Sequence, residues 1–127
     1  MQQNKNGLQK RLKSFTYAFS GIIGLIKSEP NARIHLIATI FAIIAGVIFN
    51  ISPLEWCIII LVIAFVWAAE GFNTVFEKLS DHLFPEYNET AKKIKDISAG
   101  AVLICAIAAL ITGLIIFLPK LFSYIYL

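Results

Sequence analysis

Two long stretches of this 127-residue sequence carry no charged side chain. Residues 34–54 form an uncharged run of 21, and residues 97–119 form one of 23. At a rise of about 1.5 Å per residue, a helix made from either run is long enough to cross the hydrocarbon core of a bilayer. With 58% hydrophobic and only 15% charged residues, the chain has more apolar material than a soluble domain of this size can bury. The sequence therefore predicts an integral membrane protein.

A third, shorter uncharged run lies between the other two. Residues 56–69 contain no charge, and Glu55 and Glu70 stand at its two ends. A run of 14 is typical of a buried core helix when it stands alone. Flanked by two spans, it is better interpreted as a third span whose carboxylates lie at the two interfaces. We therefore predict one all-α membrane domain, residues 1–127, with three spans near residues 33–50, 54–70 and 99–118.

Basic residues gather on one side of the predicted spans. Ten of the eleven Lys and Arg residues precede the first span or lie between the second and the third, and Lys120 alone lies opposite. The positive-inside rule then places the N-terminus and residues 71–98 in the cytoplasm, with the turn NISPLE outside. The net charge of +3 is a topological signal, and we expect no nucleic-acid partner.

The segment ahead of the first span has helical periodicity. Residues 8–28 place apolar side chains three or four positions apart, at Leu12, Phe15, Phe19, Ile22, Ile23 and Ile26. Lys10, Arg11 and Lys13 accompany them, and this pattern predicts an amphipathic helix lying in the membrane interface. The segment is either a surface anchor or a direct part of a site, and both readings stay open.

Polar side chains recur along one face of the segment that follows the second span. Glu70, Asn73, Glu77 and Asp81 are spaced i, i+3, i+7 and i+11. At about 100° per residue they fall within a stripe roughly 80° wide on a helix. We therefore predict that the second span continues as a helix through residues 70–81.

Like charges aligned on a helix repel each other, so this row needs a reason to exist. A solvated polar face, a site for a divalent cation or for catalysis, and salt bridges within an oligomer would each account for it. Glu70 favours a functional site, because an ionisable group at the edge of the bilayer is costly.

Two polar segments flank this row. Residues 28–35 contain Glu29 and Arg33, with Pro30 at a helix start and Ser28 as the expected N-cap. His35 is readily explained as a core histidine bonded to a neighbour. Residues 86–96 are expected to form a polar loop that closes on Lys95-Asp96. Carboxylates and lysines together suit Mg²⁺ and phosphate, although no G-x-x-x-x-G-K-[ST] motif is present.

Taken together, these segments resemble a known family, the prokaryotic diacylglycerol kinases and undecaprenol kinases. The family pattern E-x-x-N-T-x-x-E-x-x-x-D matches residues 70–81, and K-D-x-(S/A)-A-x-A-V-L matches residues 95–103. An acidic residue ahead of an N-x-R stretch matches Glu29 through Arg33. The resemblance covers roughly residues 8–118.

The resemblance implies a bacterial inner-membrane enzyme, a homotrimer of three-span protomers with a surface helix. Such an enzyme transfers the γ-phosphoryl group of MgATP to the hydroxyl of a lipid alcohol, diacylglycerol or undecaprenol. By the same resemblance Glu70 is the general base, Asn73 its polar partner, and Glu29 and Glu77 the ligands of Mg²⁺. The residues implied to bind the nucleotide are Lys10 (where arginine is common), Tyr17, Glu29, Glu77, Glu86, Tyr87, Asn88, Lys95 and Asp96.

A function of another class competes with this one. The chain could be a non-catalytic membrane protein, an assembly partner or a small transporter, whose acidic row serves salt bridges or ion passage. The first and third spans are almost wholly apolar, which argues against a polar pore.

Overall fold

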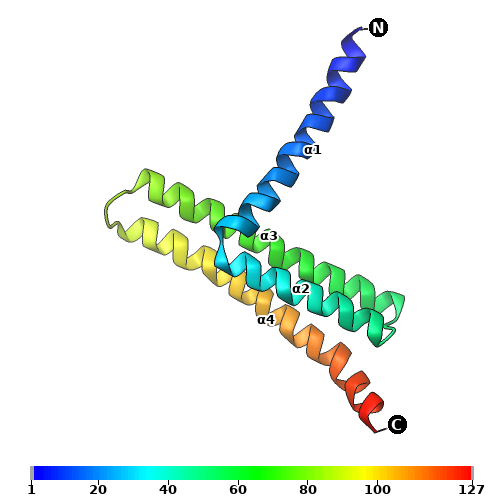
Figure 1. The fold of residues 1–127 in the computed structure, drawn as a ribbon. Coiled ribbons are helices and arrows are strands. Elements are labelled where there is room, and N and C mark those ends of the chain that lie inside the picture. Colours follow the sequence, from blue (N-terminus) through cyan, green and yellow to red (C-terminus); the bar gives the residue numbers. More distant parts are fainter. Residues whose placement is uncertain (1, 127) are drawn as a thin grey trace.

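Four helices make up the computed structural model, which describes residues 2–126. They are α1 (Gln2–Ser28), α2 (Pro30–Ile48), α3 (Pro53–Leu83) and α4 (Glu89–Ile125). Helices α2, α3 and α4 run alongside one another in alternating directions, and α1 projects away from them (Figure 1). The all-helical class is confirmed.

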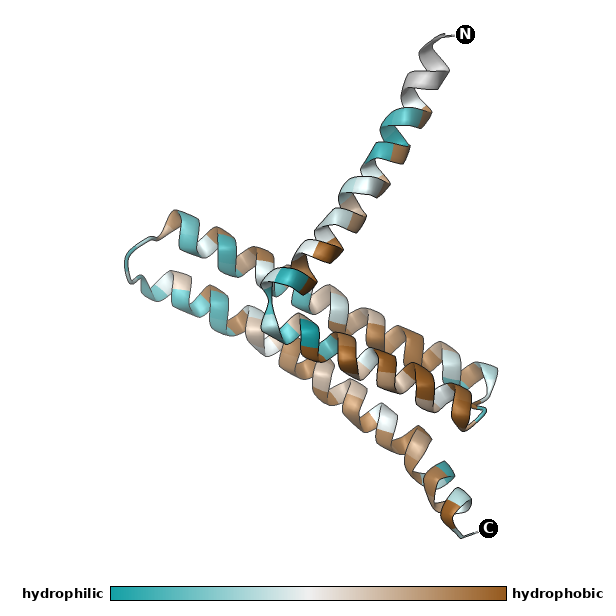
Figure 2. Cartoon of the chain, in the orientation of Figure 1, coloured by the Kyte–Doolittle hydropathy of each residue, from teal (hydrophilic) through white to brown (hydrophobic). Residues whose placement is uncertain are grey.

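Three of the four helices, α2, α3 and α4, are long and apolar enough to cross a membrane. Figure 2 shows their apolar residues along the bundle and polar residues on the α3–α4 hairpin, where these two helices extend beyond the start of α2. Most large apolar side chains on these helices are exposed in the single chain. Lipid or other protein must therefore cover them.

The second predicted span does continue as a helix, because α3 runs without a break from Pro53 to Leu83. Its start is fixed by a capping box, in which Ser52 Oγ accepts from Glu55 N and Glu55 Oε2 accepts from Ser52 N. Asn50, in the preceding turn, has a φ of 47°. Asparagine tolerates this left-handed conformation better than most residues do.

The polar loop expected over residues 86–96 is wrong beyond residue 88. Asn88 caps α4, since its Oδ1 accepts from Thr90 N at 2.9 Å and from Ala91 N at 3.1 Å. Residues 89–96 are therefore helical, and only residues 84–88 connect α3 to α4. Polar composition had suggested a loop, but a single cap and packing against α3 are enough to carry the helix through it.

The α1–α2 junction also differs from expectation. Ser28 is the last residue of α1 rather than an N-cap, and the N-cap of α2 is Glu29 in an extended conformation. Arg33 stabilises the bend, because its Nε donates to Ile26 O at 3.1 Å and its Nη2 donates to Lys27 O at 2.5 Å. These carbonyls belong to the end of α1, where intrahelical donors run out.

Gly46 allows a close approach at the end of the bundle opposite this junction. A Cβ at this position would lie 2.6 Å from Trp56 Cη2 and 2.8 Å from Trp56 Cζ2.

We expect Gly46→Ala to destabilise the fold by about 1–3 kcal/mol, because the rigid indole must move. Thermal unfolding in detergent would show this as a lower midpoint. Gly7→Ala is the control, because a Cβ at Gly7 meets nothing within 4 Å; an equal loss in both variants would contradict the packing argument.

Candidate functional site

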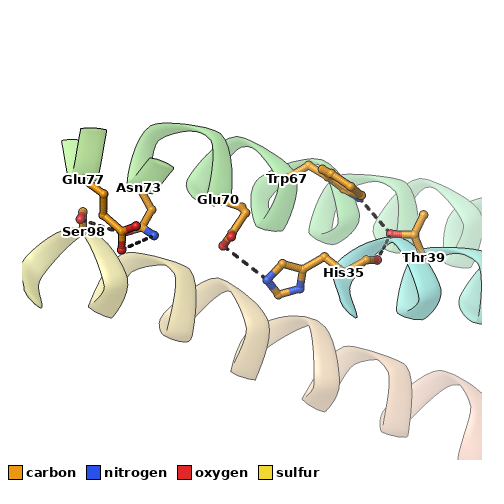
Figure 3. A network of polar contacts seen from close by, with 7 residues as sticks. All are labelled: His35, Thr39, Trp67, Glu70, Asn73, Glu77 and Ser98. Atoms are coloured by element: carbon orange, nitrogen blue, oxygen red, sulfur yellow. Dashed lines mark hydrogen bonds and ion pairs between the residues drawn. The ribbon is translucent and has the colours of Figure 1, made fainter. Parts of the chain in front are cut away.

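Glu70 is the most deeply buried charged side chain among the described residues, with 2% of its surface exposed. Its Oε2 atom lies 3.6 Å from Nε2 of His35 on α2, and Figure 3 shows the two side chains pointing toward each other. In the part of the chain that the structure describes, this buried oxygen has no hydrogen-bond partner. A buried acceptor without a partner is costly and is typical of a functional position.

Asn73 lies one turn further along α3 and is also buried. Its Nδ2 donates to Glu77 Oε1 at 3.3 Å, and its Oδ1 accepts from Ser98 Oγ on α4 at 2.8 Å. The two bonds fix the orientation of the amide (Figure 3). Asn73 therefore holds the Glu77 carboxylate in place and ties α3 to α4.

The predicted row of acids changes character along α3. Glu70 and Asn73 are buried, Glu77 is half-buried, and Asp81 is exposed. Asp81 accepts a charged hydrogen bond from Lys95 of α4. Solvent exposure therefore rises along the row, from the buried Glu70 to Asp81, whose charge is paired at the surface. It rises because α3 extends beyond the start of α2 along this stretch (Figure 1).

Glu29 approaches the row from the α1–α2 junction. Its Oε1 lies 3.4 Å from Lys78 Nζ of α3 and accepts from Ser28 Oγ at 2.9 Å. Lys78 Nζ also donates to Ser28 Oγ at 3.3 Å. Glu77, the neighbour of Lys78 on α3, lines the same cavity as Glu70. The junction therefore brings Glu29 to the part of α3 that carries the acidic row.

A cavity of about 270 Å³ lies among α2, α3 and α4 beside these acids. Its polar wall comes from α2 and α3, and its apolar wall from α4. The residues that line it are Asn31, Ile34, His35, Glu70, Asn73, Glu77, Ala99, Val102, Leu103 and Ala106. A carboxylate on a largely apolar wall suits a ligand with a hydroxyl head and an apolar remainder.

The carboxylates could bind a divalent cation only together with ligands from outside the protein. Within residues 2–126, no three His, Cys, Asp or Glu side chains are grouped closely enough to hold a metal by themselves. Mg²⁺ commonly uses one or two protein carboxylates and takes its other ligands from phosphate and water. Glu29 and Glu77 offer the carboxylate oxygens that such a site uses.

The other predicted nucleotide contacts lie apart from Glu70 in the single chain. Lys10 and Tyr17 belong to the exposed part of α1 that projects from the bundle (Figure 1). Glu86 and Tyr87 are exposed in the α3–α4 connection, where Asn88 serves as the cap of α4. On the surface of α4, Asp96 Oδ2 accepts from Lys92 Nζ at 2.6 Å, and Lys95 contacts Asp81.

Two residues of the site carried no assigned role at the sequence level. Ser98 supports Asn73, and its only sequence signal is its place one turn after Lys95 in the matched motif. His35 contacts Glu70 as a core histidine bonded to a neighbour would, but that neighbour is the central acid of the row. Neither pairing can be deduced from spacing within one helix.

Comparison with known proteins places this arrangement among its relatives. A family model described as prokaryotic diacylglycerol kinase matches residues 16–117. The chain is similar to an undecaprenol kinase of Bacillus subtilis (strain 168), with 37% identity over 120 residues that cover 94% of the chain and 98% of the relative. It is also similar to a diacylglycerol kinase of a Synechocystis species, with 35% identity over 113 residues that cover 88% of the chain and 65% of that longer protein.

Proposed function

Because the chain belongs to the prokaryotic diacylglycerol kinase family and is a membrane lipid kinase, we propose that Glu70 is its general base. The observation that carries this role is the burial of Glu70 beside a cavity, at the depth where the apolar span turns polar. A base for a lipid hydroxyl must lie where the bilayer meets the aqueous phase, because the two substrates come from these two phases. Asn73 then acts as its polar neighbour and holds Glu77.

In the proposed reaction, one O–H bond and one P–O bond break, and a new P–O bond and a new O–H bond form. The lipid hydroxyl gives its proton to Glu70, its oxygen bonds to the γ-phosphorus of ATP, and the bond from that phosphorus to the β–γ bridging oxygen breaks. ADP leaves with the electron pair of the broken bond. Phosphoryl transfer of this kind depends mainly on positioning and on charge neutralisation.

Glu29 and Glu77 would hold Mg²⁺ together with the phosphates of ATP. When bound, the cation neutralises phosphate charge and orients the transferred group. Asn73 supports this role, because its amide fixes Glu77. For the remaining nucleotide contacts we retain the assignments that the resemblance implies: Lys10, Tyr17, Glu86, Tyr87, Asn88, Lys95 and Asp96.

A homotrimer in the bacterial inner membrane is part of the proposal. Its support is the small share of each apolar helix that the single chain buries, together with the family resemblance. Small residues on α4, such as Gly100, Ala108 and Gly113, permit close helix contacts. The basic residues orient the N-terminus and the α3–α4 hairpin toward the cytoplasm, where ATP is available.

An isoprenoid alcohol is the proposed acceptor. The support is the match to an undecaprenol kinase over nearly the full length of both proteins. The small side chains of Ala99 and Ala106 leave room in the cavity for the reacting end of such a chain.

A panel of lipid alcohols tests this proposal directly. Purified protein in detergent with MgATP labelled at the γ-phosphate should transfer the label to undecaprenol faster than to diacylglycerol, as resolved by thin-layer chromatography. Faster labelling of diacylglycerol would overturn the acceptor assignment but not the kinase. If no lipid alcohol were labelled and no ATP bound, the function would instead be that of a non-catalytic membrane protein.

A further inference from the structure

His35 of α2 contacts the proposed general base, Glu70, but takes no part in the phosphoryl transfer itself. Its Nε2 lies 3.6 Å from Glu70 Oε2, and both side chains line the same 270 Å³ cavity. We propose that His35 accepts, through Glu70, the proton that the acceptor hydroxyl gives up, and releases it to water. This inference rests on the proposed role of Glu70 as general base.

The contact between His35 and Glu70 is held by a second contact one turn along α2. Thr39 Oγ1 donates to His35 O at 2.7 Å and accepts from Trp67 Nε1 of α3 at 3.0 Å (Figure 3). Trp67 lies one turn before Glu70 on α3. Because the two contacts are each one helical turn apart on α2 and α3, they lock the register that brings the imidazole to the carboxylate.

Burial explains why a relay is needed. Glu70 is 2% exposed, whereas the side chain of His35 is 16% exposed. Each turnover leaves one proton on the buried carboxylate, and it must depart before the next hydroxyl can react. Imidazole both accepts and releases protons near neutral pH, which carboxylates and lysines in water do less readily.

The charged groups around the pair leave His35 as the acceptor. From α3, Glu77 faces the cavity, but its Oε1 already accepts from Asn73. From the α1–α2 junction, Glu29 contacts Lys78, and Arg33 of α2 is turned toward the carbonyls of α1. The α4 wall of the cavity is apolar along its described length. Lys95 of the same helix contacts Asp81.

The balanced step is a pair of proton transfers. The hydroxyl O–H bond breaks as the Glu70 O–H bond forms, and the lipid oxygen bonds to phosphorus. The Glu70 O–H bond then breaks as a bond from the proton to His35 Nε2 forms, which restores the carboxylate. The imidazolium, on a side chain that is 16% exposed, then releases the proton to water.

Two variants separate proton transfer from packing. His35→Gln keeps a polar side chain at this position but cannot carry the proton, and His35→Ala removes the whole imidazole. We expect each to lower kcat about tenfold or more while KM for ATP and lipid stays unchanged. Added imidazole should restore the kcat of His35→Ala, with a dependence on pH that follows the free base. The matched control is His82→Gln, because His82 is an exposed histidine of α3 that does not line the cavity; this variant should keep the wild-type kcat and pH–rate profile.

A measurement without turnover checks the contact itself. In ¹⁵N NMR of the full-length protein, Glu70→Gln should change the imidazole signals of His35 and leave those of His82, the second histidine, unchanged. Unaltered His35 signals would overturn the inference. So would a His35→Gln enzyme with wild-type kcat and pH profile, even while Glu70→Gln is inactive. If Glu70→Gln remained fully active, the proposed general base would fail first, which distinguishes the two cases.

Discussion

Glu70→Gln should lower kcat for lipid phosphorylation by about 10²- to 10⁴-fold, the range that general acid–base catalysis contributes. The amide has the size of the carboxylate but cannot take up the hydroxyl proton. Since Glu70 is buried and its Oε2 has no hydrogen-bond partner among the described residues, removing the charge should not weaken the fold. Transfer of labelled phosphate to the preferred lipid measures the loss, and circular dichroism and thermal unfolding report the fold.

Glu55→Gln is the matched control for this variant. Glu55 lies at the opposite end of the same helix, where it contacts Lys120 at 3.1 Å and completes the capping box. Glutamine also serves in such a box, so the fold and kcat should both persist. Wild-type turnover in Glu70→Gln would sink the general-base assignment, and equal losses in both variants would point to folding instead.

Glu77→Gln and Glu29→Gln should each raise the Mg²⁺ concentration for half-maximal activity by about 10- to 100-fold, the scale at which metal sites respond to lost support. A site with only two protein carboxylates has little to compensate for the loss of one. Titration of activity with Mg²⁺ at saturating ATP and lipid measures the shift.

Asp81→Asn tests whether any acid of the row would behave in this way. Asp81 lies one turn beyond Glu77 but is exposed and contacts Lys95, so its Mg²⁺ dependence should match the wild type. A shift in Asp81→Asn as large as that in Glu77→Gln would mean a general charge effect. An unchanged Mg²⁺ dependence in Glu29→Gln and Glu77→Gln would refute their assignment as ligands.

Much of the fold could be predicted because it depends on local and compositional signals. Charge-free runs are read directly against the thickness of a bilayer, and they located three of the helices. The periodicity of Glu70, Asn73, Glu77 and Asp81 correctly predicted that α3 continues past the apolar run. The same reasoning failed over residues 89–96, because a polar helix on a hairpin has the composition of a loop until its cap and its packing partner are known.

Helix starts were predicted less well than helices. Pro30 stands in the first turn of α2, as its sequence position indicated. Ser28 has the chemistry of an N-cap, yet α1 extends through it and Glu29 takes that place. The side chain of Arg33 decides this boundary, because it bonds the last carbonyls of α1. That interaction joins residues on either side of the junction, so the sequence around Ser28 alone does not predict it.

By itself, the sequence determined the membrane location, the three long apolar helices and the face of α3 that carries the acids. These follow from hydrophobicity and from the 3.6-residue repeat, which are properties of one segment at a time. Only the tertiary structure decided which acid is desolvated and what contacts it: His35 from α2 against Glu70, and Ser98 from α4 against Asn73. The physical reason is that such contacts depend on the axial register between helices. That register is set by contacts between helices, such as the hydrogen bond that Trp67 Nε1 donates to Thr39 Oγ1, and not by the spacing within any one helix.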